Sequence, residues 1–547
     1  MSRKVRGLSL SRLPAYGLSG SFLHELFWIR VMGIRDKVVH ITLLVSAVLV
    51  LWLVWGTGIH GDDYLLLNQI GRLNIGDLFR PDLHVSNVNV FSPVGYFFNY
   101  FPYYLFGKTY LLGYDLYKFL SAVCAGFMAY RFVNDYLPRA RALLAVAMFI
   151  LLPIHDTTLF WHLTHLYVLT PAVIMYAHHL VRRDQYKVGF LAGMCGAFSS
   201  FVSPPYTFGL GAIFILEQKW KKAFVFFVPG LLYVVFYFYM TNVLKGHPGR
   251  ISSHLDGMTF FKQYLLQMAS FLDVAVGPSF WLKLIYSANA VTVGSLVLGL
   301  IVLAIFVRCF DVERIQYPAT LIGGALAVTM LAFGMFALTG FYPQIAFNLG
   351  NRVTTFGSLL LAFGVAVLPL SRRQFTIVAA VLLVSVLGLS DHWRSWNARQ
   401  LEVIHNLQTN TELAKVEPNS TILVVGHHFS KLGPFAHVDF FCEDPVQIFA
   451  YALGQKPDYA AYSVSRRHYV QEHDLVDKKW GKVTQLSDEV IIYDAETNSL
   501  RRIASDKLND YLSALPLDVR HWVQLLDDGW TRRTVIYLMP RLEYLFV

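Results

Sequence analysis

The sequence predicts an α-helical polytopic membrane protein with about eleven transmembrane helices, followed by a small α/β domain outside the membrane. Hydrophobic residues make up 55% of the 547 positions and charged residues only 15%, a composition too apolar for a soluble protein. Long apolar runs recur between residues 38 and 390. After Asp391 the composition becomes that of an ordinary globular domain. The chain therefore divides into a basic segment (1–37), a membrane domain (38–390) and a C-terminal domain (391–547).

The first apolar run, VVHITLLVSAVLVLWLVWGTGI, extends from Val38 to Ile59 without a charge. It has about 20 residues, enough to cross a hydrocarbon core of roughly 30 Å. Lysine and arginine outnumber acids in segment 1–37, so the positive-inside rule predicts a cytoplasmic N-terminus. The run lacks a small-residue cleavage pattern and is expected to remain as an anchor.

Ten further apolar runs predict the other spans, at 109–132, 141–154, 166–181, 187–203, 205–217, 222–242, 287–307, 318–340, 354–370 and 374–390. Threading the chain through these spans puts the basic clusters on the cytoplasmic side, around Arg139, Arg182, Lys219, Arg308 and Arg372. The topology is consistent only if the apolar stretch around Pro204-Pro205 forms two short helices bent at the prolines. One tilted span there would place every later loop on the opposite side of the membrane.

The same threading assigns the loop 60–108, a longer loop at 243–286 and the C-terminal domain to the extracytoplasmic side. The first loop has amphipathic and aromatic stretches suited to helices in the membrane interface, where they would roof a cavity. In the C-terminal domain, TILVV predicts a buried strand and DEVIIYDAETNSLRRI a strand-turn-strand unit. The domain has no glycine-rich phosphate loop, Ser-His-Asp signature or zinc spacing.

The net charge of +10 arises from cations in the short loops between apolar runs. There they set topology and contact anionic membrane lipids, so nucleic acid is not an expected partner. We expect a multi-pass protein of the cell (inner) membrane.

Two adjacent carboxylates, Asp62 and Asp63, directly follow the first span. One interpretation is that Asp62 caps an interfacial helix beginning at Asp63, where acids suit the positive helix end. The functional interpretation is a general base or metal ligand at the membrane edge. Neighbouring side chains diverge in a helix or a strand, so we expect only one of them to point into a given pocket.

The turn PIHDTTLFWHLTHLY at 153–167 returns to the same side and brings a second acid, Asp156, with His155, His162 and His165. His162 and His165 would share a helix face and reach one ligand or proton donor. Alternatively, the histidines belong to an aromatic and polar interface belt.

Arg352 is the single cation of the turn 341–356, at the start of an apolar span. It would either snorkel to lipid head groups or clamp a phosphate, assisted by hydrogen bonds from Asn351 and Asn348.

This layout resembles the GT-C superfamily of integral-membrane glycosyltransferases, which includes protein O-mannosyltransferases, aminoarabinose transferases and oligosaccharyltransferases. The resemblance covers residues 38 to about 370 and lies in the cytoplasmic N-terminus, the acidic motif Asp62-Asp63 after the first span, and Asp156 in the next outer loop. No WWD-type acceptor motif follows Asp391, which disfavours the oligosaccharyltransferase branch.

The resemblance implies transfer of a sugar from a polyprenyl-phosphate donor to a glycan, lipid or protein acceptor on the extracytoplasmic side. Asp62, Asp63 or Asp156 would be catalytic, whereas Arg352, Asn351 and the three histidines would bind substrate. Some relatives need a divalent cation, and the three acids would offer oxygen ligands to Mg²⁺ or Mn²⁺. The metal requirement stays open. Two alternatives are a polymerase of lipid-linked glycans and a flippase or transporter that uses the intramembrane charges Asp115 and Lys118.

Overall fold

The computed structural model describes residues 34–70, 74–79, 91–243, 256–309, 317–340, 342–441, 444–477, 482–516, 533, 534 and 537. The predicted basic segment 1–37 therefore lies largely outside the described residues. The α-helices of the membrane domain are α2 (Ile34–Val54), α3 (Asp63–Ile70), α5 (Pro93–Phe106), α6 (Leu111–Val133), α7 (Arg139–Leu151), α8 (Thr157–Phe160), α9 (Leu166–Arg182), α10 (Tyr186–Ser199), α11 (Ser203–Leu216), α12 (Trp220–Val243), α13 (Gly257–Val276), α14 (Pro278–Asn289), α15 (Val293–Cys309), α16 (Ala319–Thr339), α17 (Thr355–Val367) and α18 (Arg372–Thr409). Short 3-10 turns connect some of them, namely η1 (Ile75–Phe79), η3 (Pro153–His155), η4 (His162–Thr164) and η5 (Leu349–Thr354).

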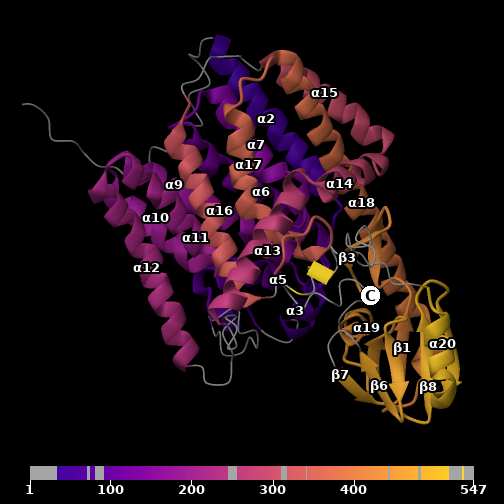
Figure 1. The fold of residues 1–547 in the computed structure, drawn as a ribbon. Helices are drawn as coiled ribbons and strands as arrows, with labels where there is room; N and C mark the ends of the chain where they lie inside the picture. The colour runs from indigo at the N-terminus through magenta and orange to yellow at the C-terminus, as the bar shows by residue number, and fades with distance from the viewer. Residues whose placement is uncertain are drawn as a thin grey trace, which may run out of the picture.

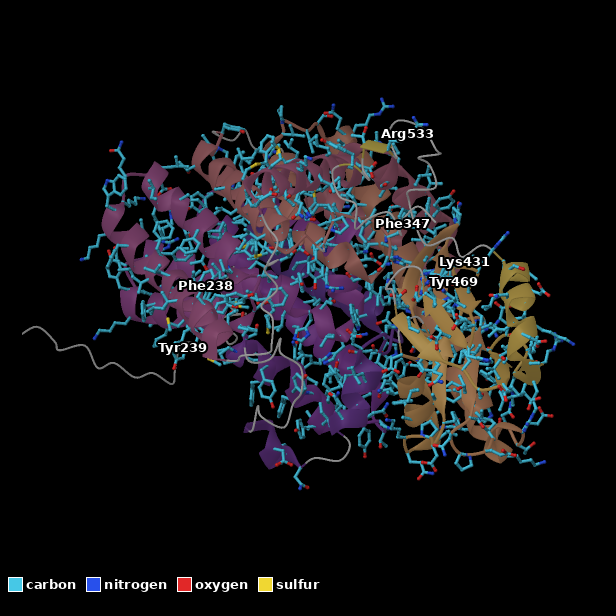
Figure 2. All side chains as sticks on the ribbon, turned by 60° about the horizontal axis from the view of Figure 1, so that its bottom comes forward. Phe238, Tyr239, Phe347, Lys431, Tyr469 and Arg533 are labelled. Atoms are coloured by element: carbon cyan, nitrogen blue, oxygen red, sulfur yellow. The ribbon has the colours of Figure 1, made fainter. Side chains whose placement is uncertain are left out.

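The long helices form one bundle, with α12 at the edge farthest from the C-terminal domain (Figure 1). Within the described residues, six helical segments are long and apolar enough to cross a membrane, and three shorter helices are apolar as well. Exposed Phe238 and Tyr239 on α12 lie on this outer edge (Figure 2), where large apolar side chains suit contact with lipid. The predicted helical membrane architecture is confirmed, whereas the total of eleven spans stays a prediction.

Charged side chains gather at one end of the bundle, which we call the basic end. Arg182 donates to Glu217 at 2.7 Å, and Arg183 contacts Asp135 at 2.8 Å. Arg141 donates to the backbone oxygen of Leu368 at 2.6 Å, just beyond the last turn of α17. The structure thus collects the loops around Arg139, Arg182, Lys219 and Arg372, which were predicted to share one side of the membrane, while the placement of the Arg308 cluster stays a prediction.

The prolines at 204 and 205 fall in the first turn of α11, where a missing N–H is tolerated. Residues 200–202 separate this helix from α10. An ion pair at 2.8 Å joins Lys222, near the start of α12, to Asp184, just before α10. The chain therefore leaves the basic end and returns to it between these residues, which confirms the predicted helical hairpin.

The prediction of a loop at 243–286 is wrong for the described part of that segment. Helices α13 and α14 occupy it, joined at Gly277 and Pro278. Polar residues such as Gln263, Gln267 and Asp273 interrupt the apolar positions, and this dilution hid the helices from a search for apolar runs.

Helix α18 runs without a break through the predicted boundary at Asp391 and ends in the C-terminal domain (Figure 1). Ser371 and Gln374 form a capping box at its start. Its 38 residues correspond to about 57 Å at 1.5 Å per residue. One rigid element thus belongs to both parts of the molecule.

The C-terminal domain has a four-stranded sheet in the order β4-β1-β8-β9. The buried strand β1 (Thr421–Val425) pairs in parallel with β4 (Ala460–Ser463) and β8 (Glu489–Asp494), and β8 forms an antiparallel hairpin with β9 (Ser499–Ala504). The predicted strand and strand-turn-strand unit are confirmed. The remaining elements are β2 (Phe429–Leu432), β3 (Phe435–Asp439), α19 (Pro445–Leu453), β5 (His468–Gln471), β6 (Asp474–Asp477), β7 (Lys482–Gln485), α20 (Leu508–Ala514) and the turns η6 (Leu413–Lys415) and η7 (Ser505–Lys507).

Candidate functional site

The two adjacent acids point in opposite directions at the start of α3. Asp63 is the first residue of the helix and is fully buried, whereas Asp62 is exposed. The Asp63 carboxylate accepts hydrogen bonds from the Tyr103 hydroxyl at 2.5 Å and from the His60 backbone N–H at 2.9 Å. The predicted helix beginning at Asp63 is present, its position in the membrane interface stays a prediction, and only Asp62 of the two acids is exposed.

Burial raises the pKa of Asp63 to about 7, although the hydrogen bond from Tyr103 opposes this shift. Between the unfolded-state pKa and the folded-state pKa, the folded protein holds a proton that the unfolded chain has lost. The free energy of unfolding is therefore highest below the unfolded-state pKa and falls as the pH rises toward the folded-state pKa. This stabilisation disappears as the pH rises through about 7. The full loss of stability, from below pH 4 to above pH 7, is about 4 kcal/mol.

The variant Asp63→Asn is therefore expected to escape the loss of stability that the wild type shows as the pH rises from about 4 to about 7. Asparagine mimics the protonated acid, because its amide N–H can donate to Tyr103 while its oxygen still accepts from His60. Thermal unfolding of the purified protein in detergent, measured at several pH values, checks this expectation. The apparent melting temperature of the wild type should fall relative to that of Asp63→Asn as the pH rises; parallel curves would contradict the assignment.

The exposed Asp62 lies within electrostatic range of the guanidinium of Arg352. Arg352 interacts electrostatically with Asp62 and hydrogen-bonds the side chain of Tyr167. Its guanidinium carbon lies 5.4 Å from the ring centre of Trp161, and Nη1 donates to the backbone oxygen of Leu349 at 2.7 Å. The structure thus brings one predicted acid together with the predicted phosphate-binding cation.

Gly61 permits the close packing that creates this arrangement. Its φ of +52° is a left-handed conformation that favours glycine. A Cβ atom at this position would lie 3.1 Å from the Cδ1 atom of Leu349 and 3.4 Å from the ring of Trp161. The indole N–H of Trp161 donates to the backbone oxygen of His60 at 2.8 Å, which fixes the ring beneath Arg352.

Asp156 occupies a different place and is buried in a network of four donors. Oδ1 accepts from the Lys283 ammonium at 3.0 Å and from the Asn351 amide at 2.6 Å. Oδ2 accepts from the Trp393 indole at 2.7 Å and is 2.8 Å from Nε2 of His437. The Lys283 ammonium and the His437 side chain hold the pKa of Asp156 well below its usual range despite burial. Asp156 is therefore a buried, ionised anchor.

The Asp156 anchor and the exposed Asp62 are connected through the turn η5. Asn351 donates to Asp156, and its side-chain oxygen accepts from the hydroxyl of Thr157. The next residue is Arg352. The sequence prediction placed Asn351 in direct contact with substrate, but in the structure its side chain is buried and fixes the turn that carries Arg352.

The three predicted histidines are buried below these groups. Nδ1 of His155 contacts the hydroxyl of Thr158 at 2.9 Å. His162 and His165 stack on each other with ring centres 5.3 Å apart, and the rings of Tyr103 and His162 are nearly perpendicular with centres 5.0 Å apart. Burial lowers the pKa of His155 and of His165 to about 4 and that of His162 well below 6.5. All three are neutral at pH 7, which does not suit phosphate binding, and His162 and His165 lie among aromatic rings.

The three acids do not converge on a common point. No group of three or more His, Cys, Asp or Glu side chains in the described part of the chain is arranged to hold a metal ion. Asp63 and Asp156 also use both carboxylate oxygens in hydrogen bonds. We therefore assign no chemical step to Mg²⁺ or Mn²⁺.

Sequence reasoning missed three members of the network around Asp156, namely Lys283, Trp393 and His437. Two of them carried a weak signal: Lys283 is the one charge in PSFWLKLIYSAN, and His437 is a polar residue inside the apolar strand FAHVD. Lys283 and His437 lie 127 and 281 positions from Asp156, so only the fold joins them.

No protein-family model and no curated protein matches the chain. Among solved structures, the chain is similar to ArnT from Cupriavidus metallidurans bound to undecaprenyl phosphate and to the same protein in the apo state. Each comparison has 12% sequence identity and a TM-score of 0.41, and covers 78% of this chain and 86% of the other. This likeness concerns the arrangement of helices alone, so a function for this chain has to come from its own residues.

Proposed function

We propose that the protein is a membrane glycosyltransferase that moves a sugar from a polyprenyl-phosphate donor to an acceptor on the extracytoplasmic side. The observation that carries this proposal is the exposed carboxylate of Asp62, which follows the first membrane helix, within electrostatic range of the half-buried guanidinium of Arg352. A lipid-linked donor requires a site at the edge of the bilayer, and phosphate recognition suits a guanidinium with its five N–H donors.

The proposed reaction needs one base and one cation. The acceptor hydroxyl attacks the anomeric carbon of the donor sugar, and its proton passes to Asp62. The bond between the anomeric carbon and the phosphate oxygen breaks, and the polyprenyl phosphate leaves with the electron pair. Arg352 stabilises the negative charge that develops on the leaving phosphate.

The surroundings of Arg352 and Asp62 favour these two roles. Arg352 is held by Leu349 and Tyr167 and packs over Trp161, so its position is largely fixed before a substrate arrives. Preorganised charge costs little reorganisation during the reaction. Asp62 is the member of the acid pair that remains exposed and can reach an acceptor.

The buried charges Asp115 and Lys118 do not favour the transporter alternative. They form an ion pair at 2.8 Å, and each is at most 1% exposed. Asp115 accepts from the backbone N–H of Gly56 and of Gly58, and Lys118 donates to the backbone oxygen of Gly58. These contacts join the end of α2 to α6, and the two charges are paired with each other and hydrogen-bonded to the backbone.

The test is transfer of labelled sugar from a panel of undecaprenyl-phosphate sugars by the purified full-length protein, with a membrane extract as the source of acceptor. Arg352→Gln should raise the KM for the donor by about 10- to 100-fold, since a hydrogen bond to a charged group contributes roughly 1.5–3 kcal/mol. Arg352→Lys should retain part of the affinity, because the charge remains but the fork of N–H donors is lost.

Lys431→Gln supplies the control, since it removes an exposed cation from strand β2 (Figure 2). This variant should transfer sugar at the wild-type rate. A wild type that neither binds nor consumes any donor would overturn the proposed function. A ladder of products in place of one added sugar would assign the protein to the polymerases of lipid-linked glycans.

A further inference from the structure

Strand β3 of the C-terminal domain contributes one side chain to the network that positions Arg352. His437 lies on β3 and is completely buried at the junction between the domain and the membrane bundle. Its Nε2 atom is 2.8 Å from the Asp156 carboxylate, and its Nδ1 atom accepts from the backbone N–H of Asn348 at 3.3 Å. An imidazole that accepts at Nδ1 must carry its proton at Nε2, so His437 is neutral and donates to Asp156.

This contact reaches a loop that is held from several directions. We call residues 342–354 the arginine loop, because it ends in η5 and carries Arg352. Lys283 donates to the backbone oxygen of Ala346 at 2.9 Å while it pairs with Asp156. Phe347 packs against Phe435 of the β2–β3 hairpin, with ring centres 4.4 Å apart.

The loop has a conformation that needs such support. Asn348 has a φ of +72°, a left-handed conformation that is uncommon outside glycine. Its side chain accepts from the backbone N–H of Gly350 at 3.0 Å, which starts the turn η5. The backbone N–H of Asn348 donates a hydrogen bond to Nδ1 of His437. His437 thus holds the residue at which the chain turns toward Arg352.

We infer that His437 is a positioning residue of the active site, through which the C-terminal domain orders the arginine loop and so places Arg352 for the donor phosphate. The final link to the phosphate rests on the proposed function, whereas the ordering of the loop does not. Without His437, the bundle would keep Asp156, Lys283 and Asn351 in contact, but the N–H of Asn348 would lose its buried acceptor.

Two substitutions at this position separate positioning from simple packing. His437→Gln keeps an N–H donor for Asp156 and a carbonyl acceptor for Asn348. His437→Phe keeps a ring but removes both hydrogen bonds. Val490→Ala is the matched control, because it removes two methyl groups from the separate core of the C-terminal domain, which is built around β1 and β8.

The experiment combines hydrogen–deuterium exchange of peptides covering the arginine loop with binding of undecaprenyl phosphate, both on the full-length protein. In His437→Phe, the backbone amides of the arginine loop should exchange at least tenfold faster than in the wild type. The same variant should bind undecaprenyl phosphate at least tenfold more weakly. His437→Gln should restore both values to within about threefold of wild type, an interval set by ~0.65 kcal/mol at 25 °C. Val490→Ala should leave both unchanged.

Unchanged loop exchange in His437→Phe would overturn the positioning role, whatever the protein binds. Faster exchange with unchanged binding would overturn the link from the loop to the phosphate. A wild type that does not bind undecaprenyl phosphate would reject the proposed function and that link, while the exchange result would still decide whether His437 orders the loop.

Discussion

Asp62→Asn is expected to lower the rate of sugar transfer by about 10²- to 10⁴-fold, the usual contribution of a general base. Asparagine has nearly the same size but cannot accept the proton of the acceptor hydroxyl. The substitution should leave donor binding within about threefold of wild type, because Arg352 and not Asp62 is expected to hold the phosphate. Steady-state rates and a separate binding measurement on the purified variant distinguish these two effects.

The stability of Asp62→Asn should barely differ from that of the wild type, since surface substitutions usually alter the free energy of unfolding by no more than about 0.5 kcal/mol. Glu402→Gln is a matched control: Glu402 is an exposed acid on α18, paired with Arg399 at 2.8 Å. It should transfer sugar at the wild-type rate. If Asp62→Asn retained full activity while Asp63→Asn lost it, the base would have to be the buried acid.

Lys283→Met is expected to destabilise the protein by about 3–5 kcal/mol, because it leaves the buried carboxylate of Asp156 without its cation. The side chains of both residues are at most 1% exposed, so solvent cannot replace the lost partner. Asp156→Asn should cost a similar amount for the converse reason. The double variant should lose much less than the sum of the two single losses, since neither charge then remains unpaired.

Thermal and denaturant-induced unfolding in detergent, followed by tryptophan fluorescence, measures these losses. The control is Lys219→Met, which breaks a lysine–carboxylate contact of 2.6 Å at the basic end, where the lysine side chain is 40% exposed. Exposed pairs contribute about 0–1 kcal/mol, so this variant should unfold close to wild type. Equal losses for Lys283→Met and Lys219→Met would show that Asp156 finds another partner or becomes protonated.

The helices of the bundle were largely predictable because a membrane span is a local property. A long apolar run needs only its own backbone hydrogen bonds, so its ends follow from composition. The run 109–132 became α6 (Leu111–Val133), and the run at 318–340 became α16 (Ala319–Thr339). Helices α13 and α14 were not predicted because polar residues interrupt their apolar positions, although the segment Gly257–Asn289 as a whole is long and apolar enough to cross a membrane.

The candidate site was only partly predictable for a related reason. Asp62 and Arg352 were found because each is an unusual charge at the end of an apolar run. Asp62 could not be ranked against Asp63 from the sequence, since their different exposure depends on where Tyr103 packs. Likewise, no local pattern pairs Asp156 with His437, because strand β3 reaches the bundle only after the C-terminal domain has folded onto α18.

The unbroken length of α18 restricts how this protein can change during evolution. An α-helix has 3.6 residues per turn, so inserting or deleting a single residue between the bundle and the domain would rotate everything beyond it by about 100°. Such a rotation would carry strand β3 away from Asp156. Length variation is therefore expected in the connections at the distal strands, while the central part of α18 can accept substitutions but not a change in residue number.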